Sequence, residues 1–150
     1  MKITVAAVAG HSRSSYKATD CFAAEYVERA SRYVPTDLQL FDSEAACLES
    51  IDRSQGRIAA YLVLLDSRGQ LLTSKEFAER LGTLRDSGTQ RVVLAVGPAD
   101  GWSLAARERA NLLFSLGRIT LPHQLARVVL AEQVYRAFTI LAGHPYHCGH

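Results

Sequence analysis

Cysteines, long apolar runs and a secretion signal are scarce or missing in this chain, and each absence excludes a class of protein. The three cysteines, Cys21, Cys47 and Cys148, are odd in number and far apart, which argues against a disulfide framework and favours a reducing compartment. No stretch reaches about 20 apolar residues with membrane-type flanks, so no membrane span is predicted. The first nine residues are followed by a glycine and by no cleavage-like region, which is typical of a first strand rather than of a secretion signal. We therefore expect a cytoplasmic protein with no membrane partner.

Two common phosphate-binding signatures are also missing, and net charge is small. The turn after Ala9 has no GxGxxG pattern, which argues against a conventional nicotinamide site, and the chain has no Gly-Lys-Ser/Thr loop. A net charge of +2 does not by itself establish nucleic-acid binding. Its distribution is more informative, because residues 101–150 hold 5 basic and 2 acidic side chains and 14 of the 17 basic residues are arginine. Arginine suits phosphate contacts, although a solvated arginine face is the simpler interpretation of any one residue.

Apolar strand-like runs alternate with amphipathic segments along the whole chain. A chain of 150 residues is long enough for one compact domain, which we expect to span residues 1–150. The predicted strands are Ile3–Ala9, Leu38–Phe41, Ile58–Leu65, Arg91–Val96 and Arg118–Thr120. The predicted helices cover 15–33, a short segment after Ser43, a segment capped by Ser74, Ser103 to about Phe114, and Gln124–Ala142. This alternation predicts an α/β domain with a mainly parallel sheet.

The last helix has the most unusual composition. Gln124–Ala142 is apolar nearly all round and is interrupted only by Arg127, Glu132, Gln133, Arg136 and Thr139. A helix that is apolar on every side has to be buried on every side, which in so small a chain requires a second subunit. We therefore expect a homodimer. Gly143 provides a left-handed residue to end the helix, and Pro145 prevents it from resuming.

Three predicted strand ends mark the expected ligand site. They are Leu65-Asp66, Val96-Gly97 and Thr120-Leu121, and each lies close to glycine or proline. Ligands of parallel α/β sheets bind beyond the carboxyl ends of the strands, and glycine lets backbone approach a ligand closely. Glycine at such turns also has a purely conformational explanation.

Six segments together resemble one family. They are Leu64–Gly69 followed by Thr73–Ala78, then Val96–Gly101, Ile119–His123, Ala131–Ala137 and His144–His147. With Leu-Pro-His, Glu-x-x-Tyr-Arg-Ala and His-Pro-Tyr-His in this order, essentially the whole chain resembles the RlmH-type SPOUT methyltransferases. The resemblance implies a homodimeric, parallel-sheet α/β knot (a C-terminal trefoil knot) that binds S-adenosyl-L-methionine. The knot is expected from the resemblance alone, since knotted chains are rare. The implied reaction is methylation of N3 of a pseudouridine in 23S ribosomal RNA, with pseudouridine 1915 as the family's target.

The resemblance also implies which residues bind the cofactor, with backbone groups of Gly117, Ile119 and Leu121 expected to contact the adenine. The expected cofactor residues are Leu65, Gly97, Pro98, Gly101, Gly117, Arg118, Ile119, Thr120, Leu121 and Pro122. Two positions depart from the family pattern. Gly97-Pro98 replaces a usual Gly-Gly, and proline removes an N–H donor and fixes φ near −65°. Cys148 replaces an arginine that commonly follows the last histidine.

Histidines near the two ends of the last helix are the expected chemical groups. His123, His144, Tyr146 and His147 are candidate catalytic residues, and Arg136, His144 and His147 are candidate substrate contacts. A group that titrates near neutrality suits removal of the N3 proton, although positioning alone would let that proton pass to water. The alternatives are structural: His123 bonding a loop carbonyl and Arg136 pairing with Glu132. Likewise, Asp66 would either contact the cofactor or cap the following turn, and Trp102 would pack under its loop rather than stack on a base.

Two other functions stay open on the sequence. His144, His147, Cys148 and His150 form a His/Cys-rich tail that would suit zinc, but no second ligand set accompanies it. A ribosome-associated RNA-binding module with weakened or lost methyl transfer is the second alternative, with Pro98 as the lesion. The expected partner is ribosomal RNA in the large subunit or the assembled ribosome. The small net charge favours a folded ribosomal surface over naked RNA.

Overall fold

The structure, a computed structural model, describes residues 1–9, 17–54, 56 and 58–148, and within these residues one parallel sheet forms the centre of the molecule. Its strand order is β2-β1-β4-β3-β5. Each neighbouring pair is parallel. The strands are β1 (Lys2–Val8), β2 (Thr36–Phe41), β3 (Tyr61–Leu71), β4 (Arg91–Val96) and β5 (Leu112–Ser115). The predicted parallel α/β class is confirmed.

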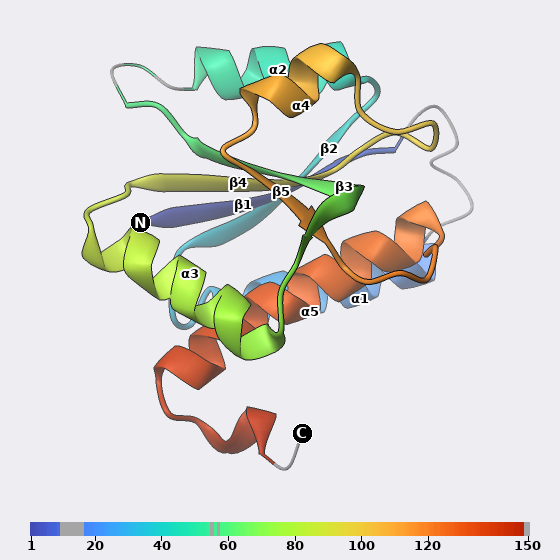
Figure 1. Ribbon diagram of the computed structural model, residues 1–150. Helices are drawn as coiled ribbons and strands as arrows, with labels where there is room; N and C mark the ends of the chain where they lie inside the picture. Colours follow the sequence, from blue (N-terminus) through green and yellow to red (C-terminus); the bar gives the residue numbers. More distant parts are fainter. Residues whose placement is uncertain (10–16, 55, 57, 149–150) are drawn as a thin grey trace.

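Helices cover both faces of the sheet (Figure 1). They are α1 (Lys17–Ala30), α2 (Glu44–Arg53), α3 (Ser74–Asp86), α4 (Leu104–Arg109) and α5 (His123–Leu141), followed by the 3-10 turn η2 (Pro145–His147). Helices α2 and α4 lie over one face, and α1, α3 and α5 lie over the other (Figure 1). Two apolar clusters, one on each face, fill the space between the layers.

The central strands explain the continuous apolar runs of the sequence. Every residue of β1 after Lys2 is buried, as is every residue of β4 after Arg91. A strand covered by helices on both faces has no solvent side, so its sequence does not alternate. The two strands pair with each other in the middle of the sheet and give the core its rigid base.

The starts of α2, α3 and α4 follow the expected N-capping chemistry, with one correction to the predicted cap residue of α3. The hydroxyls of Ser43 and Ser103 accept from the backbone N–H groups of Ala46 and Ala106, so both act as N-caps. The cap of α3 is Thr73 rather than Ser74. Thr73 forms a reciprocal capping box with Glu76, and this box places the helix start one residue earlier than the serine predicted. The Ser74 hydroxyl donates instead to Gln133 of α5 at 2.8 Å.

The predicted fifth strand is wrong. Residues 118–120 lie in a loop, and the strand is Leu112–Ser115, inside the segment predicted as helix. Helix α4 ends at Arg109 because Asn111 joins the edge of β3: its side chain accepts from Leu62 N at 2.7 Å, and its N–H donates to Leu62 O at 2.8 Å. This tertiary contact overrides the helical preference of the local sequence.

Strand β3 begins three residues later and runs further than predicted. The expected turn at 66–69 is present, but as a bulge within the strand. Leu65 is the register partner of Phe114, and Gln70 is also its partner. The intervening residues loop out, with Asp66 accepting from Arg68 N at 2.8 Å. The strand then resumes its pairing with β5.

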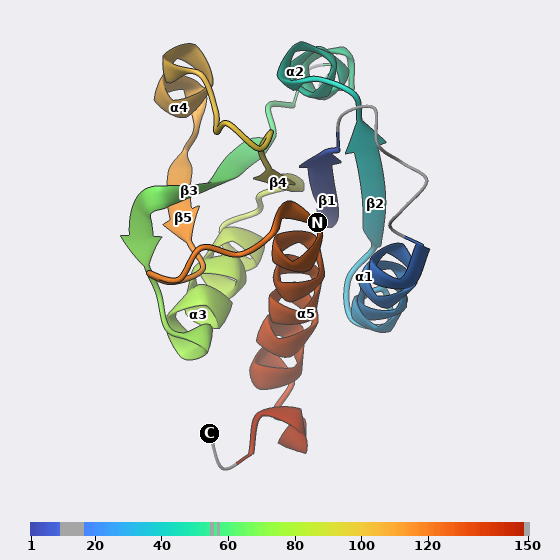
Figure 2. The same cartoon turned by 90° about the vertical axis from the view of Figure 1, so that its right-hand side faces the viewer.

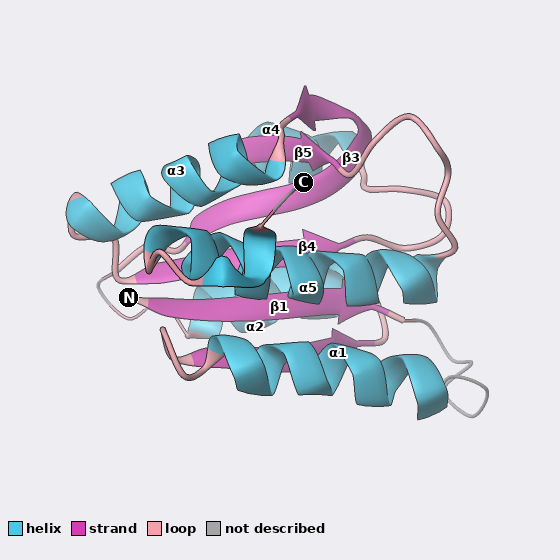
Figure 3. Cartoon of the chain, turned by 90° about the horizontal axis from the view of Figure 1, so that it is seen from below, coloured by secondary structure: helices cyan, strands magenta, loops and turns pink. Residues whose placement is uncertain are grey.

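Helix α5 lies between α1 and α3 on one face of the sheet (Figure 3). The residues that its own chain buries are Arg127, Leu130, Ala131, Val134, Ala137, Phe138 and Thr139. Most other positions are only half-buried, and Leu125 is exposed. The helix ends as predicted, with Gly143 at φ 69° and the His144 N–H bonded to Thr139 O at 2.9 Å. A single chain therefore leaves one side of this apolar helix partly uncovered.

Candidate functional site

A cleft of about 670 Å³ opens where the bulge of β3, the loop after β4 and the loop after β5 meet. This volume lies within the range of small-molecule sites. The three segments predicted to converge do so, although the first is a bulge and the third is a loop. All predicted cofactor residues line the cleft, namely Leu65, Gly97, Pro98, Gly101, Gly117, Arg118, Ile119, Thr120, Leu121 and Pro122. His123 lines it as well.

The loop between β5 and α5 presents backbone to the cleft. Gly117 has φ 139°, and a Cβ at this position would meet nothing within 4 Å. The Ser115 hydroxyl fixes the turn, donating to Gly117 O at 2.9 Å and accepting from Gly117 N at 3.2 Å. The side chain of Ile119 is 82% exposed. The turn is thus ordered by its own hydrogen bonds while the space beside it stays open to a ligand.

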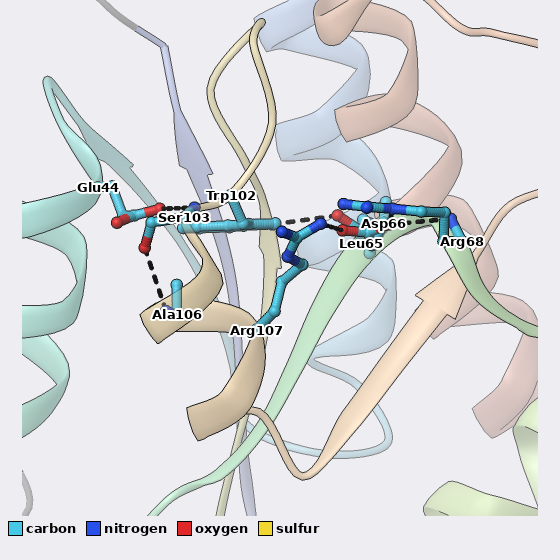
Figure 4. A network of polar contacts seen from close by, with 8 residues as sticks. All are labelled: Glu44, Leu65, Asp66, Arg68, Trp102, Ser103, Ala106 and Arg107. Atoms are coloured by element: carbon cyan, nitrogen blue, oxygen red, sulfur yellow. Dashed lines mark hydrogen bonds and ion pairs between the residues drawn. The ribbon is translucent and has the colours of Figure 1, made fainter.

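Trp102, the chain's single tryptophan, also lines the cleft and points toward Leu65 (Figure 4). It is buried, and its Nε1–H donates to Leu65 O at 3.0 Å. A Cβ on Gly97 would lie 2.7 Å from Cε2 of the indole, so only glycine permits this packing. Of the two interpretations, the structure supports the one in which Trp102 packs beneath its loop. The indole joins the bulge of β3 to the loop after β4.

The proline in that loop is accommodated without distortion of the turn. Gly101 N–H donates to Pro98 O at 2.9 Å, and Gly101, at φ 87°, takes the left-handed position. Beyond the turn, the N–H of Ser103 donates to the Glu44 carboxylate at 2.7 Å (Figure 4). The loop is therefore anchored by Trp102 on one side and by α2 on the other. Compared with the glycine usual at this position, Pro98 lacks the backbone N–H donor.

Asp66 brings charge to the cleft wall. Its carboxylate, only 6% exposed, accepts from the Arg68 backbone and lies 3.3 Å from Arg68 Nε and 3.9 Å from Arg107 Nη1 (Figure 4). The turn-capping interpretation of Asp66 is therefore correct. The contact with Arg107 of α4 was not predicted, since nothing in the local sequence links the two positions. Asp66 and Arg68 together give this part of the cleft an acidic and a basic group.

His123 begins α5 at the edge of the cleft. Burial, and then the positive charge of Arg127, lower the pKa of His123 below its usual 6.5, while backbone contacts with Gly97 and Val8 oppose the shift. No hydrogen bond of good geometry reaches its buried Nε2 from the described residues. Arg127 itself is 1% exposed and forms a 3.0 Å ion pair with Asp20 of α1. This unpredicted pair ties the start of α5 to α1.

Three of the other predicted catalytic and substrate residues, Arg136, Tyr146 and His147, form a second group. Together with Glu132 and Tyr135 they are called the tail cluster. Arg136 Nη2 lies 2.7 Å from Glu132, and its Nη1 lies 3.0 Å from His147 Nδ1. The Tyr146 hydroxyl donates to Glu132 at 3.0 Å, and the rings of Tyr135 and Tyr146 are 4.7 Å apart. Arg136 therefore makes the expected pair with Glu132 and a histidine contact besides. His144 lies beside the cluster, where its Nδ1 accepts from Tyr146 N at 3.2 Å.

The cleft and the tail cluster are apart within one chain. Nine residues of α5 separate His123 from Glu132, which corresponds to about 14 Å along the helix. Figure 2 shows the segment before α5 at one end of the helix and the C-terminal turn at the other. Neither Arg136 nor any residue of the described tail, 143–148, lines the cleft. Of the predicted catalytic residues, a single chain places only His123 beside the predicted cofactor residues.

Two features of the structure bear on the zinc and membrane predictions. Among the described residues, no group of three or more His, Cys, Asp or Glu side chains is arranged to hold a metal ion. His150, the fourth expected member of the zinc alternative, lies outside that part of the chain. No helix of the described residues is long and apolar enough to cross a membrane.

The parallel fold and the cleft of backbone turns at one edge of the sheet are those of a ligand-binding α/β protein. A family model described as "Predicted SPOUT methyltransferase" matches residues 1–147, and the chain belongs to this family. The resemblance noted from the sequence motifs is thereby confirmed. S-adenosylmethionine, the cofactor predicted from that resemblance, is the methyl donor that this family uses.

Individual relatives carry a more particular name. A "Ribosomal RNA large subunit methyltransferase H" from Koribacter versatilis is 52% identical over 126 residues, which cover 84% of this chain and 86% of that protein. A protein of the same name from Agrobacterium fabrum is 41% identical over 139 residues, covering 83% and 87%. Among solved structures, the SpoU methyltransferase AviRb from Streptomyces viridochromogenes, in complex with AdoMet, matches 96% of this chain and 58% of its own. Its sequence identity is 12% and its TM-score is 0.46.

Proposed function

We propose that this protein transfers a methyl group from S-adenosylmethionine to N3 of a pseudouridine in 23S ribosomal RNA, with pseudouridine 1915 as the target. The observation that carries the proposal is the meeting of three sequence-distant segments, 65–68, 96–102 and 114–123, in one cleft. These are the segments that the family resemblance assigns to the cofactor. The name of the relatives, ribosomal RNA large subunit methyltransferase H, supports the RNA substrate.

The cleft suits S-adenosylmethionine in size and in chemistry. Its volume of about 670 Å³ accommodates a nucleoside joined to an amino acid. Exposed backbone at 117–121 offers the donors and acceptors that an adenine edge needs, and the open space at Gly117 lets the ligand approach. Asp66 and Arg68 supply charges of both signs for an amino-acid zwitterion. Leu65, Gly97, the 98–101 turn and the 117–122 loop would hold the cofactor.

The bound cofactor would supply an electrophilic methyl group, and the chain's own contribution is alignment. Orientation of two reactants lowers a barrier by about 7–11 kcal/mol when the geometry is held rigidly. Trp102, Ser115 and Glu44 provide that rigidity here, because each fixes a cleft loop through a hydrogen bond. His123 is held largely uncharged by burial and by Arg127, which lowers its pKa. A neutral imidazole at the cleft edge does not repel a cationic ligand.

We further propose that the protein acts as a homodimer with the C-terminal trefoil knot of its family. The uncovered side of α5 supports the dimer, because apolar helix surface of this kind is stabilised by a second copy. The distance between the cleft and the tail cluster supports it independently, since catalysis by His144, Tyr146 and His147 requires a tail from another chain. Sedimentation equilibrium is expected to give twice the chain mass. A monomer at micromolar concentration would contradict this arrangement.

The substrate is expected to be a folded ribosomal surface in the large subunit or the assembled ribosome. A net charge of +2 neutralises few phosphates, so tight binding to naked RNA is not expected. Equal methylation of short unstructured transcripts and of ribosomes would contradict this view.

The decisive experiment adds radiolabelled methyl donor to ribosomes from cells that lack the gene and maps the label by mass spectrometry. Wild-type protein is expected to label one pseudouridine, at N3, and the variants Gly97→Val and His147→Asn are expected to lose that activity. The loss of a backbone donor at Pro98 favours one rival, an RNA-binding module without methyl transfer. Ribosome binding without label, together with no cofactor binding by calorimetry, would establish that rival.

A further inference from the structure

The contact between Arg136 and His147 determines where the imidazole carries its proton. Arg136 Nη1 lies 3.0 Å from Nδ1 of His147. A guanidinium group has five N–H donors and no acceptor, so Nδ1 has to be the acceptor. A neutral imidazole with an unprotonated Nδ1 carries its hydrogen on Nε2. The remaining nitrogen of His147 is therefore a donor in the neutral ring.

Glu132 keeps that guanidinium in place. One carboxylate oxygen of Glu132 accepts from Arg136 Nε at 2.9 Å and from the Tyr146 hydroxyl at 3.0 Å, and it lies 2.7 Å from Arg136 Nη2. The guanidinium carbon also lies 4.7 Å from the centre of the Tyr146 ring. The hydrogen bond to Glu132 raises the pKa of Arg136, so the donor toward His147 stays charged. Because Glu132 and the Tyr146 ring hold the guanidinium group of Arg136 in place, the tautomer of His147 is fixed too.

The other two candidate groups of the tail are hydrogen-bond donors as well. Burial and the hydrogen bond to Glu132 raise the pKa of the Tyr146 phenol, which stays protonated at neutral pH. Nδ1 of His144 accepts from the backbone N–H of Tyr146 at 3.2 Å, so a neutral His144 likewise carries its hydrogen on Nε2. The tail therefore presents N–H donors.

We infer that Glu132 and Arg136 are positioning residues that make His147 a hydrogen-bond donor, through Nε2–H, to a carbonyl oxygen of the substrate base. The inference rests on the proposed function, in which the reacting nitrogen, N3, lies between two carbonyl groups. When N3 loses its proton to water, the negative charge spreads onto those oxygens, and a preorganised N–H donor stabilises it. The nitrogen lone pair then forms the bond to the methyl carbon. The bond between that carbon and sulfur breaks, and its electron pair stays on the sulfur.

The tautomer is tested on the free protein, without any substrate. We would label histidine with ¹⁵N, identify the His147 signals from their absence in His147→Gln, and record long-range ¹H–¹⁵N correlations at pH 8. The wild type is expected to show His147 only in the Nε2–H form. In Arg136→Met, which removes the donor, the ring is expected to become a mixture of both forms, while Arg136→Lys keeps the Nε2–H form. Arg85→Gln, a helical arginine of α3 beside Asp86, is the matched control and should change nothing. An Nδ1–H signal in the wild type would overturn the inference.

The role of the donor is tested by two amide substitutions that differ in where they place the NH₂ group. His147→Gln places an amide nitrogen near the position of Nε2, and His147→Asn places it near Nδ1. A donor role predicts that kcat of the glutamine variant stays within about threefold of wild type, whereas the asparagine variant loses about 10²–10³-fold, as loss of one oxyanion donor does. A general-base role predicts that both variants lose about 10²–10⁴-fold, because neither amide accepts a proton. That second result would overturn the inference.

The two experiments separate this inference from the proposed function. If the wild type never methylates ribosomes, the proposed function fails, and the tautomer measurement still reports on the tail cluster. If the wild type is active but His147 is protonated on Nδ1, the proposed function stands and the inference fails. Glu132→Gln adds a third measurement. It is expected to lower kcat about tenfold with little change in KM for the methyl donor, because the cofactor segments do not include Glu132.

Discussion

The two ends of helix α5 are built in different ways. At its start, the cleft consists of backbone turns and a buried tryptophan, its loops are fixed by hydrogen bonds to backbone groups, and Arg127 in the second turn of the helix pairs with Asp20. At its end, the tail cluster consists of charged and aromatic side chains that contact one another through Glu132. The backbone turns of the cleft suit a ligand of fixed shape. The side-chain contacts of the tail cluster instead suit control over which atoms donate and which accept hydrogen bonds. The comparison predicts that substitutions at the two ends have different consequences.

The largest expected effect on ligand binding is at Gly97. A Gly97→Val side chain would displace Trp102, whose indole atoms lie 2.7 Å from a Cβ at this position. Misplacement of a cleft wall by about 1 Å weakens function about a hundredfold, and we expect such a loss in affinity for S-adenosylmethionine by calorimetry. Ala105→Val, at an exposed position of α4, is the control and should bind as wild type does. Unchanged affinity in Gly97→Val would show that the indole does not shape the site.

The largest expected effect on stability is at the ion pair of the cleft end. Asp20→Asn leaves the charge of Arg127 buried without its partner, and such a change costs about 3 kcal/mol in the free energy of unfolding. Glu132→Gln breaks a pair whose arginine side chain is 19% exposed, against 1% for Arg127, and should cost about 1 kcal/mol. Urea titrations of both variants would measure the difference. Equal losses would contradict the view that the burial of Arg127 makes its ion pair the more costly one to break.

The outcomes at these two ends also show what a sequence allows one to predict. The cleft segments were predictable because Gly97, Gly101, Gly117 and Pro122 mark turns locally, and because parallel sheets gather such turns at one edge. The contacts from Trp102 to Leu65 and from Asp20 to Arg127 were not predictable, since 37 and 107 residues separate the partners. An Arg136–Glu132 pair follows from helical spacing, but the addition of Tyr146 and His147 to it depends on how the chain turns at Gly143.

The errors in the predicted secondary structure also arise from contacts between residues that are far apart in the sequence. The segment Leu112–Ser115 is apolar enough for a helix or a strand, and it becomes a strand because Asn111 bonds to Leu62 on β3. The bulge in β3 contains the turn signals of Asp66–Gly69, but no local signal shows that the strand resumes its pairing afterwards. Both features depend on the neighbouring strand rather than on the segment itself.

A smaller effect is expected from Trp102→Phe, which keeps an aromatic ring over Gly97 and removes only the indole N–H. The carbonyl of Leu65 then loses its donor, at a cost of about 1 kcal/mol in the free energy of unfolding. Affinity for the methyl donor should fall about fivefold, which is the same free energy expressed as binding. Differential calorimetry and ligand titration measure the two quantities. If Trp102→Phe matched Gly97→Val in affinity, the hydrogen bond rather than the ring would determine the shape of the cleft.

The smallest expected effect is on the pH dependence of stability. Burial and Arg127 lower the pKa of His123 in the folded protein, so the unfolded chain takes up a proton at a higher pH than the native state does. His123 therefore costs nothing above its unfolded pKa of about 6.5 and destabilises the fold progressively as the pH falls below that value. The unfolding free energy of wild type should fall more between pH 7.5 and pH 5.5 (roughly one unit on either side of that pKa) than that of His123→Gln. Parallel curves for the two proteins would contradict the assigned direction.

Calorimetric titration of the wild-type protein with S-adenosylmethionine tests the central claim most directly. The account predicts one ligand molecule per chain, with affinity lowered about a hundredfold by Gly97→Val and retained in His147→Gln, since only the first alters the cleft. The absence of heat at millimolar ligand, from protein whose fold is intact by circular dichroism, would contradict it.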